Sequence, residues 1–292
     1  MRTRHPSFAT VMMLLAVLLF ALMDAGLKLL STRYPPLQVA ALRGLSSLPL
    51  VLAWALLTVP WRSLLQVHWP LQCLRGALGV AMMVGFVYGL RGMPLSTAYA
   101  ITFVAPLLVT AMAGPILKEK VGRGRWLAIV IGLVGVLIIL RPTGQGMLTL
   151  GGLAVLVAAV CYAAGAIVVR LLAQRDSTQA MVVWFMLLLS LGALSLAWPN
   201  WQPLRSQDWL VIAGVGIAGS LAQVALTEAF RRGEASLIAP LEYTALIWGV
   251  LLDLSLWGVL PDGLTWVGAA VIVASGIYLL RRERVHVEAE HP

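Results

Sequence analysis

Residues 9–30 read ATVMMLLAVLLFALMDAGLKLL, an almost unbroken apolar run that decides the fold class. A helix needs roughly 20 mainly apolar residues to cross the hydrocarbon core of a bilayer. This run meets that length and is too long for the core of a secretory signal, so it predicts a retained transmembrane helix. Its two charged residues, Asp24 and Lys28, lie toward its second end.

Similar apolar runs fill the rest of the chain. Of the 292 residues, 60% are hydrophobic and 11% are charged, and the mean hydropathy is +0.91. A soluble domain has about a quarter charged residues, so this chain is predicted to have lipid as its solvent. The runs are continuously apolar, whereas the strands of a membrane barrel alternate. We therefore predict an all-α membrane protein of about ten transmembrane helices. The ten predicted spans are residues 9–30, 37–59, 74–90, 97–117, 126–140, 150–172, 181–198, 209–230, 236–260 and 266–280.

The formal net charge of +9 reflects membrane topology and not a nucleic-acid partner. If the N-terminus is cytoplasmic, 15 of the 21 Lys and Arg residues fall at cytoplasmic ends of the spans and five at outer ends, with Arg43 inside a span. An excess of basic residues on the cytoplasmic side is the rule for multi-pass membrane proteins. We predict a bacterial inner-membrane protein with both termini in the cytoplasm.

The chain also repeats itself at an interval of about 140 residues. YGLRGMPLSTAYAITFVAPLL at 88–108 resembles TEAFRRGEASLIAPLEYTALI at 227–247, and each is followed later by a Trp-led helix. Five spans per unit is an odd number, so the second unit enters the membrane from the opposite side. Inverted repeats are typical of secondary transporters that work by alternating access. We predict two inverted five-helix repeats with a cytoplasmic tail: residues 1–142, 143–285 and 286–292.

Several motifs resemble the drug/metabolite transporter superfamily, and within it the ten-helix EamA-type carriers. They are ALRGL around Arg43, the stretch APLLVTAMAGPILKEKVGRGRWLAIVIGLVGVLIILRP at 105–142, and LIAPLEYTALIWGVLL at 237–252. Glu119 stands where the family has a Leu-Gly-Glu turn, but its counterpart in the second repeat is Val259. That departure makes a structural or topogenic role the better interpretation for Glu119. The resemblance implies a membrane carrier of small organic molecules.

The resemblance also suggests a subfamily. Asp24 with Lys28, the Leu-Arg-Gly at 42–44 and the Pro-Leu-Glu-Tyr at 240–243 look most like carriers for S-adenosylmethionine or riboflavin uptake. Neighbouring members of the superfamily export amino acids or drugs. Two interpretations therefore remain open: uptake of a cofactor-like metabolite, and export of amino acids or cationic drugs.

An ionisable residue within a span is a functional hypothesis by default, because it costs about 2.5–3.5 kcal/mol or more at the centre of the bilayer. Asp24 and Arg43 lie at the same predicted depth, about 9 Å below the outer boundary, on adjacent antiparallel helices. We expect them to pair, either as a static brace or as a gate or substrate-binding pair at the outer vestibule. Lys28, one helical turn from Asp24, is a competing partner and a second gating candidate.

The ninth predicted span carries two carboxylates, Glu242 and Asp253, on one helix face. Glu242 adjoins Tyr243 and is close to Pro240, which loosens the helix. A carboxylate beside an aromatic ring suits a cationic or ring-bearing substrate, and it equally suits proton coupling. Asp253 is a weaker coupling candidate, because it also suits a capping role near the outer surface. Glu228, at the end of the eighth span, is a further candidate, although Arg231 and Arg232 favour a local ion pair there.

Aromatic residues complete the predicted substrate site. Tyr99 and Phe103 lie on the fourth span, and Phe103 is the repeat counterpart of Tyr243. Trp184 and Trp248 belong to spans expected to border the cavity, where they would stack on a planar substrate. We expect the cavity between spans 3, 4, 8 and 9, closed on the outside by spans 1 and 2.

An intramembrane enzyme is the alternative from another class, and a channel is a further one. All four His residues fall in tails or loops, and neither HExxH nor GxSxG occurs. A hydrolase or protease needs a nucleophile with a base, or a set of metal ligands. No catalytic residue, metal site or cofactor is therefore predicted. The predicted partners are the lipid bilayer, a small-molecule substrate and a second copy of the chain in a homodimer.

Overall fold

The computed structural model describes residues 6–117, 122–140, 150–173, 175–232 and 239–290, and these ranges are helices joined by short loops without any strand. The all-α prediction is therefore confirmed. The first unit contains α1 (Pro6–Ser31), α2 (Pro36–Thr58), η1 (Trp61–Leu64), α3 (Trp69–Leu90), α4 (Leu95–Thr102), α5 (Ala105–Leu117) and α6 (Arg123–Leu140). The second unit contains α7 (Leu150–Leu172), α8 (Thr178–Ala197), η2 (Trp198–Asn200), η3 (Ser206–Asp208), α9 (Trp209–Arg232), η4 (Ala239–Thr244), α11 (Ala245–Leu252), η5 (Asp253–Trp257) and α12 (Gly263–Glu290).

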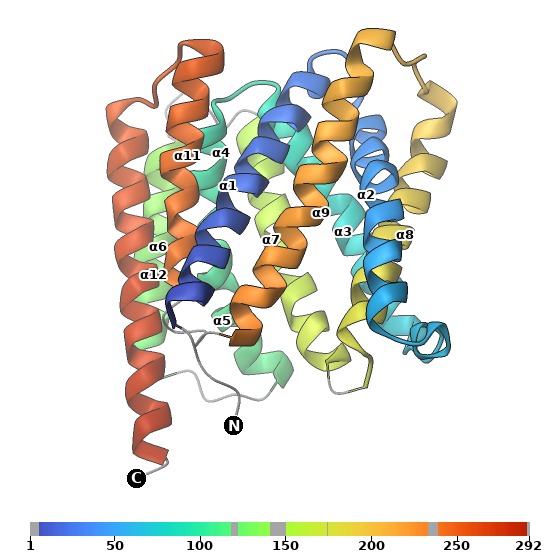
Figure 1. Cartoon of the computed structure of the whole chain (residues 1–292). Helices are drawn as coiled ribbons and strands as arrows, with labels where there is room; N and C mark the ends of the chain where they lie inside the picture. Colours follow the sequence, from blue (N-terminus) through green and yellow to red (C-terminus); the bar gives the residue numbers. More distant parts are fainter. Residues whose placement is uncertain (1–5, 118–121, 141–149, 174, 233–238, 291–292) are drawn as a thin grey trace.

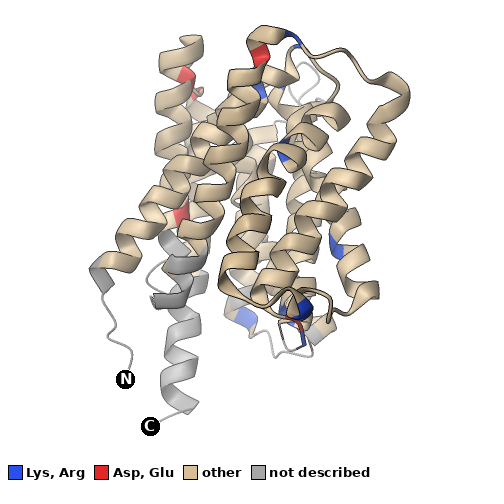
Figure 2. Cartoon of the chain, turned by 45° about the vertical axis from the view of Figure 1, so that its right-hand side comes forward, with Lys and Arg blue, Asp and Glu red and all other residues tan. Residues whose placement is uncertain are grey.

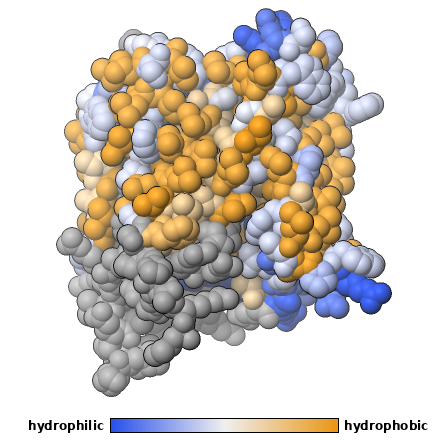
Figure 3. Space-filling view, viewed as in Figure 1, coloured by the Kyte–Doolittle hydropathy of each residue, from blue (hydrophilic) through white to orange (hydrophobic). Residues whose placement is uncertain are grey.

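The helices stand side by side as one bundle, and α1 begins on the same side on which α12 ends (Figure 1). We call this side, at the bottom of Figure 1, the terminal side, and the other the opposite side. Hydrophobic side chains cover most of the visible flank of the bundle (Figure 3). Charged residues are sparse along the helices (Figure 2). This surface suits lipid contact along the flank and water at both ends.

Seven described helical segments are long and apolar enough to cross a membrane, and Trp126–Leu140 and Gly263–Tyr278 are shorter apolar stretches. The predicted span at 150–172 coincides with α7, and most others agree within a few residues. The helices α6 and α12 extend beyond the predicted spans at 126–140 and 266–280. These two extensions lengthen the shortest predicted spans.

The fourth and ninth spans differ from the prediction, because neither is one continuous α-helix. The fourth is divided into α4 and α5 at Phe103 and Val104. Pro106 lacks an N–H group and cannot donate to the carbonyl of Thr102, so the helix is interrupted there. The ninth consists of a 3₁₀ turn, a short α-helix and a π turn. The helices α5 and α11 begin at Ala105 and Ala245, so the interruptions occupy equivalent positions of the two repeats.

The packing of the helices has the two-fold pattern expected of inverted repeats. The first helix of each unit packs along the third helix of the other, α1 on α9 and α7 on α3, and these are the most extensive contacts. Two further pairs of counterparts meet, α2 on α8 and α6 on α12, and the interrupted fourth and ninth spans meet where α4 packs on α11. The chain is thus built as two inverted five-helix repeats.

Small residues allow equivalent helices to approach closely in both units. Gly76 of α3 and Gly216 of α9 are 140 positions apart. A Cβ added at Gly76 would lie 2.7 Å from the Cβ of Leu188 in α8, and one added at Gly216 would lie 2.5 Å from the Ser46 carbonyl oxygen in α2. Glycines at equivalent positions of the two repeats therefore allow α3 to pack closely on α8 and α9 to pack closely on α2.

The predicted boundary between the repeats, at residues 142 and 143, lies outside the described residues. In the predicted tail, α12 continues as a helix to Glu290, and residues 291–292 are outside the described part of the chain.

Candidate substrate site at the interrupted helices

The two helix interruptions meet at an aromatic contact between the repeats. Phe103, at the end of α4, and Tyr243, in η4, are repeat counterparts, and their ring centroids are 5.0 Å apart with the planes at 87°. The Tyr243 hydroxyl is buried against Gly276 of α12 and has no hydrogen-bond partner among the described residues. Interrupted helices that meet near the middle of the membrane are where transporters with inverted repeats bind substrate. The structure thus brings together two of the predicted site residues.

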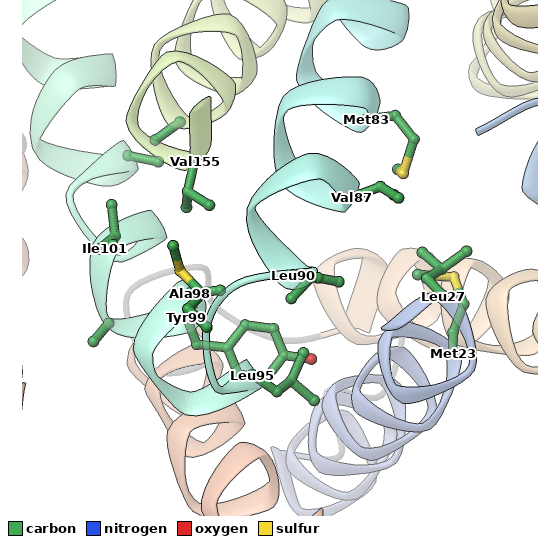
Figure 4. Close-up of a cluster of buried hydrophobic side chains, with 14 of the residues drawn as sticks. Met23, Leu27, Met83, Val87, Leu90, Leu95, Ala98, Tyr99, Ile101 and Val155 are labelled. Carbon is green, nitrogen blue, oxygen red and sulfur yellow. The ribbon is translucent and has the colours of Figure 1, made fainter. Parts of the chain in front are cut away.

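Tyr99 lies one helical turn before Phe103 and connects α4 to α1. Its hydroxyl donates to Oδ2 of Asp24 at 2.8 Å, and both residues are at least nine-tenths buried. Its ring stacks on Phe86 of α3, with centroids 6.4 Å apart and an angle of 15° between the planes. Figure 4 shows Tyr99 in the buried cluster where α1, α3 and α4 meet, with Met23 on the α1 side. Phe86 was not singled out in the sequence.

The predicted ion pair between Asp24 and Arg43 is not formed. Asp24 accepts from Tyr99, whereas Nε of Arg43 lies 3.4 Å from Sδ of Met23. The two charges remain within electrostatic range of each other. The sequence therefore correctly predicts that Asp24 and Arg43 lie near each other, but each side chain contacts a different partner.

Lys28 does not compete for Asp24, because it pairs with Asp253 across 225 positions of the sequence. The Lys28 Nζ to Asp253 Oδ1 distance is 2.9 Å, and Nζ lies 4.1 Å from the centre of the Trp257 ring. Asp253 is fully buried. Its two oxygens also accept from the backbone N–H groups of Leu95 and Ser96, at 2.9 and 2.8 Å, and from the Ser96 hydroxyl at 2.7 Å.

These five residues form the Asp253 cluster: Lys28, Leu95, Ser96, Asp253 and Trp257. Pro94, which precedes α4, has no side chain that could cap the helix. Asp253 supplies the missing cap from the other repeat, and its negative charge suits the positive end of the helix. The cluster therefore fixes the start of the helix that carries Tyr99 and Phe103.

Glu242 lies beside the aromatic contact and is half-buried. It makes no hydrogen bond or ion pair to another residue within the described ranges, and it is within electrostatic range of Tyr243 and of Tyr162 in α7. Tyr162 was not identified from the sequence. A carboxylate without a structural partner at this depth is available to a substrate or a coupling ion.

Trp184 is not part of this arrangement. Its indole N–H donates to the Leu64 carbonyl at 2.6 Å, and its ring packs edge-on against Trp69 at 4.5 Å. Trp184 lies close to the start of α8, on the terminal side, where it anchors the short helix η1. The sequence placed it in a cavity-lining span but could not give its depth relative to the helix interruptions.

Replacing Trp184 with Phe is expected to lower stability while leaving substrate affinity unchanged. Phe retains most of the ring packing but leaves the Leu64 carbonyl without its donor, at a cost of about 1 kcal/mol. Thermal unfolding in detergent and the KM of uptake measure the two effects. An increased KM with an unchanged unfolding temperature would instead indicate that Trp184 contributes to substrate binding.

Two other predicted residues have different outcomes. Trp248 in α11 is partly buried and packs against a cluster formed by Ala9, Met13 and Val17 of α1 and Ala229 of α9. The side chain of Glu228 lies outside the described residues.

A polar contact at the opposite end of the bundle was not predicted from the sequence. Tyr34, in the loop after α1, donates to Oδ2 of the buried Asp208 at 2.6 Å, and Arg33 forms an ion pair with the same carboxylate. Burial, together with the hydrogen bond to Asp208, raises the pKa of the Tyr34 phenol above its usual 10.0, so the hydroxyl stays protonated and donates. The position of Asp208 directly before α9 was an available signal, because Asp favours that position.

A smaller contact joins the repeats on the terminal side. Asp176, in the loop after α7, accepts from the Gln72 side chain at 2.8 Å and from the backbone N–H of His68 at 3.2 Å. Each side of the bundle therefore has a buried carboxylate that connects a loop of one repeat to a loop of the other.

Two inverted units with interrupted helices, an aromatic contact at the interruptions and buried charges beside it define a membrane carrier. The chain belongs to the EamA-like transporter family, which matches residues 7–141 and again residues 149–282. This places it in the drug/metabolite transporter superfamily, among multi-pass membrane proteins that carry small molecules.

The chain is similar along its length to three named relatives. It is 32% identical to a "Riboflavin transporter" of Vibrio cholerae, over 96% of this chain and 95% of the relative. It is 26% identical to the "Pseudopaline exporter CntI" of Pseudomonas aeruginosa, over 92% and 95%. It is 25% identical to an "S-adenosylmethionine uptake transporter" of Rickettsia prowazekii, over 95% and 94%. The relatives are transporters, but they differ in cargo and in direction.

Proposed function

We propose that this carrier takes up riboflavin across the inner membrane by alternating access. The carrying observation is the contact of Phe103 with Tyr243 at the two helix interruptions. Aromatic rings placed at a substrate site stack well on a planar ring system. The similarity to a riboflavin transporter over nearly the whole chain supports the same choice. The substrate crosses unchanged, so no catalytic step is assigned.

The proposed orientation places both termini in the cytoplasm. It rests on the bias of 15 basic residues against five, which corresponds to the terminal side of the bundle. In this orientation the Asp253 cluster lies toward the outside of the cell. The proposed repeats span residues 1–142 and 143–285. A homodimer is the proposed assembly, which light scattering of the purified protein would test.

S-adenosylmethionine is the second candidate substrate. Glu242 supports it, because a half-buried carboxylate beside the Tyr243 ring suits a positively charged molecule. Export, as in the pseudopaline relative, is the alternative direction.

Counterflow in proteoliposomes tests the proposal. Labelled riboflavin should accumulate in vesicles preloaded with unlabelled riboflavin and not in vesicles preloaded with S-adenosylmethionine. Accumulation of labelled S-adenosylmethionine instead would favour the second candidate, and counterflow with neither compound would contradict both. Uptake and efflux in cells that cannot synthesise riboflavin would then give the direction.

Replacing Glu242 with Gln is expected to reduce transport at least about tenfold while the protein remains folded. The change removes the charge, but it breaks no hydrogen bond or ion pair to any described residue. Counterflow rate and thermal unfolding are the two measurements. Glu242→Asp, which keeps the charge, is the matched control and should retain measurable transport. Wild-type counterflow in the Gln variant would exclude Glu242 from the site.

A further inference from the structure

Four charged side chains of the described helices are at least nine-tenths buried within the membrane-spanning part of the bundle: Asp24, Lys28, Arg43 and Asp253. Lys28 and Asp253 neutralise each other in the Asp253 cluster. Asp24 and Arg43 remain as a buried acid and a buried base that do not pair with each other. Buried charges require full hydrogen bonding, and the described side chains give Asp24 and Arg43 only part of it.

The guanidinium of Arg43 is poorly satisfied. Its five N–H groups need acceptors, and the contact found for Nε is the sulfur of Met23 at 3.4 Å, which is a weak acceptor. Nη1 is buried and has no hydrogen-bond partner within the described residues. Arg43 therefore has unused donor capacity at a place that bulk water does not reach freely.

The carboxylate of Asp24 is half satisfied. Oδ2 accepts from Tyr99, while Oδ1 makes no hydrogen bond to another side chain of the described chain. Asp24 and Arg43 lie within electrostatic range of each other, so the unused donor and the unused acceptor belong to neighbouring charged groups. Tyr99 links this acceptor to the helix that carries Phe103, so the pair adjoins the proposed substrate site.

We propose that Arg43 and Asp24 recognise a substrate edge on which a hydrogen-bond acceptor and a donor are neighbours. Arg43 binds the acceptor oxygen, and the free oxygen of Asp24 accepts from the donor. The imide edge of a flavin ring has this pattern, and so do the carboxylate and ammonium groups of an α-amino acid such as S-adenosylmethionine. This inference rests on the proposed function and assigns the polar part of the same site.

Arg43→Gln is the informative variant, because it removes a charge that no described side chain satisfies. We expect its unfolding temperature without substrate to equal or exceed that of the wild type. We expect its affinity for the bound probe to fall at least about tenfold, with Arg43→Lys intermediate because Lys lacks the planar fork. A static brace predicts the opposite: reduced stability and unchanged affinity.

The probes are riboflavin, N3-methylriboflavin, lumichrome, S-adenosylmethionine and L-methionine, measured by calorimetry on the purified wild type and Arg43→Gln. For a flavin site, N3-methylriboflavin should bind the wild type weakly, and Arg43→Gln should reduce lumichrome binding. For an amino-acid site, Arg43→Gln should reduce binding of S-adenosylmethionine and L-methionine.

The outcomes separate the two proposals. Suppose that lumichrome or L-methionine binds in an Arg43-dependent way, but neither riboflavin nor S-adenosylmethionine shows counterflow. That result would support recognition by Arg43 and Asp24 and reject the proposed function. If Arg43→Gln shows counterflow and binds the transported compound with wild-type affinity, only the proposed recognition by Arg43 and Asp24 would be rejected. Binding of none of the probes, or failure of both Arg43 variants to fold, would overturn the assignment.

Discussion

Replacing Asp253 with Ala is expected to destabilise the fold so strongly that little folded protein is recovered from the membrane. The carboxylate accepts from the N–H groups of Leu95 and Ser96, from the Ser96 hydroxyl and from Lys28. Alanine abolishes all of these contacts and leaves the Lys28 charge buried alone, which costs about 3–5 kcal/mol. Loss of the cap on α4 adds about 1 kcal/mol. A folded domain is stable by only about 5–15 kcal/mol, so the combined loss is a large fraction of it.

The yield of monodisperse protein and its unfolding temperature in detergent measure this effect. Asp253→Asn keeps an acceptor oxygen for α4 and should be intermediate. The double variant Asp253→Ala with Lys28→Met removes the orphaned charge and should recover part of the loss, as expected for two coupled positions. Wild-type stability of Asp253→Ala would show that the cluster contributes nothing to the fold.

The second large effect is expected at the crossing of α2 and α9. A Cβ at Gly216 would lie 2.5 Å from the Ser46 carbonyl oxygen and 2.7 Å from the Ser46 carbonyl carbon. Because these are backbone atoms, no side-chain rotation relieves the clash and the helices must separate. Overpacking of this kind costs about 1–3 kcal/mol or more. Gly216→Ala should therefore lower the unfolding temperature clearly, and Gly216→Leu should prevent folding.

Gly214→Ala is the matched control. Gly214 is on the same helix, two residues earlier, is exposed on the flank, and an added Cβ there meets nothing within 4 Å. Alanine is the better helix former by about 1 kcal/mol, so this variant should be as stable as the wild type or more so. Equal unfolding temperatures for the two alanine variants would contradict the close approach of α2 and α9.

Most of the fold could be predicted from the sequence, because apolar length and basic flanks determine where a helix crosses lipid. The span at 150–172 was placed to the residue. The division of the fourth span was missed, although Pro106 was a signal for it. The spacing of Gly76 and Gly216 was a further sign of the repeat that hydropathy alone does not reveal.

The candidate site could be predicted only in part. Depth along a helix can be counted from the sequence, and it correctly placed Asp24 near Arg43. The direction of a side chain around the helix axis depends on which helices become neighbours. The partner of Lys28 is therefore Asp253 in η5, 225 positions away, and the Trp184 indole N–H donates to the carbonyl of Leu64 in η1. The roles of Glu242, Tyr243, Phe103 and Tyr99 remain predictions.

The cross-packing of α1 on α9 and of α3 on α7 has a consequence for biogenesis. The first and third helices of either half find their main neighbours in the other half, so one half inserted alone would leave those faces covered by lipid only. We therefore expect that neither half folds autonomously and that the first half completes its packing only after the second is synthesised. A single half could complete its packing only against a copy inserted in the reverse direction. Gene duplication with reversal of topology would thus convert a pair of oppositely inserted chains into one continuous polypeptide.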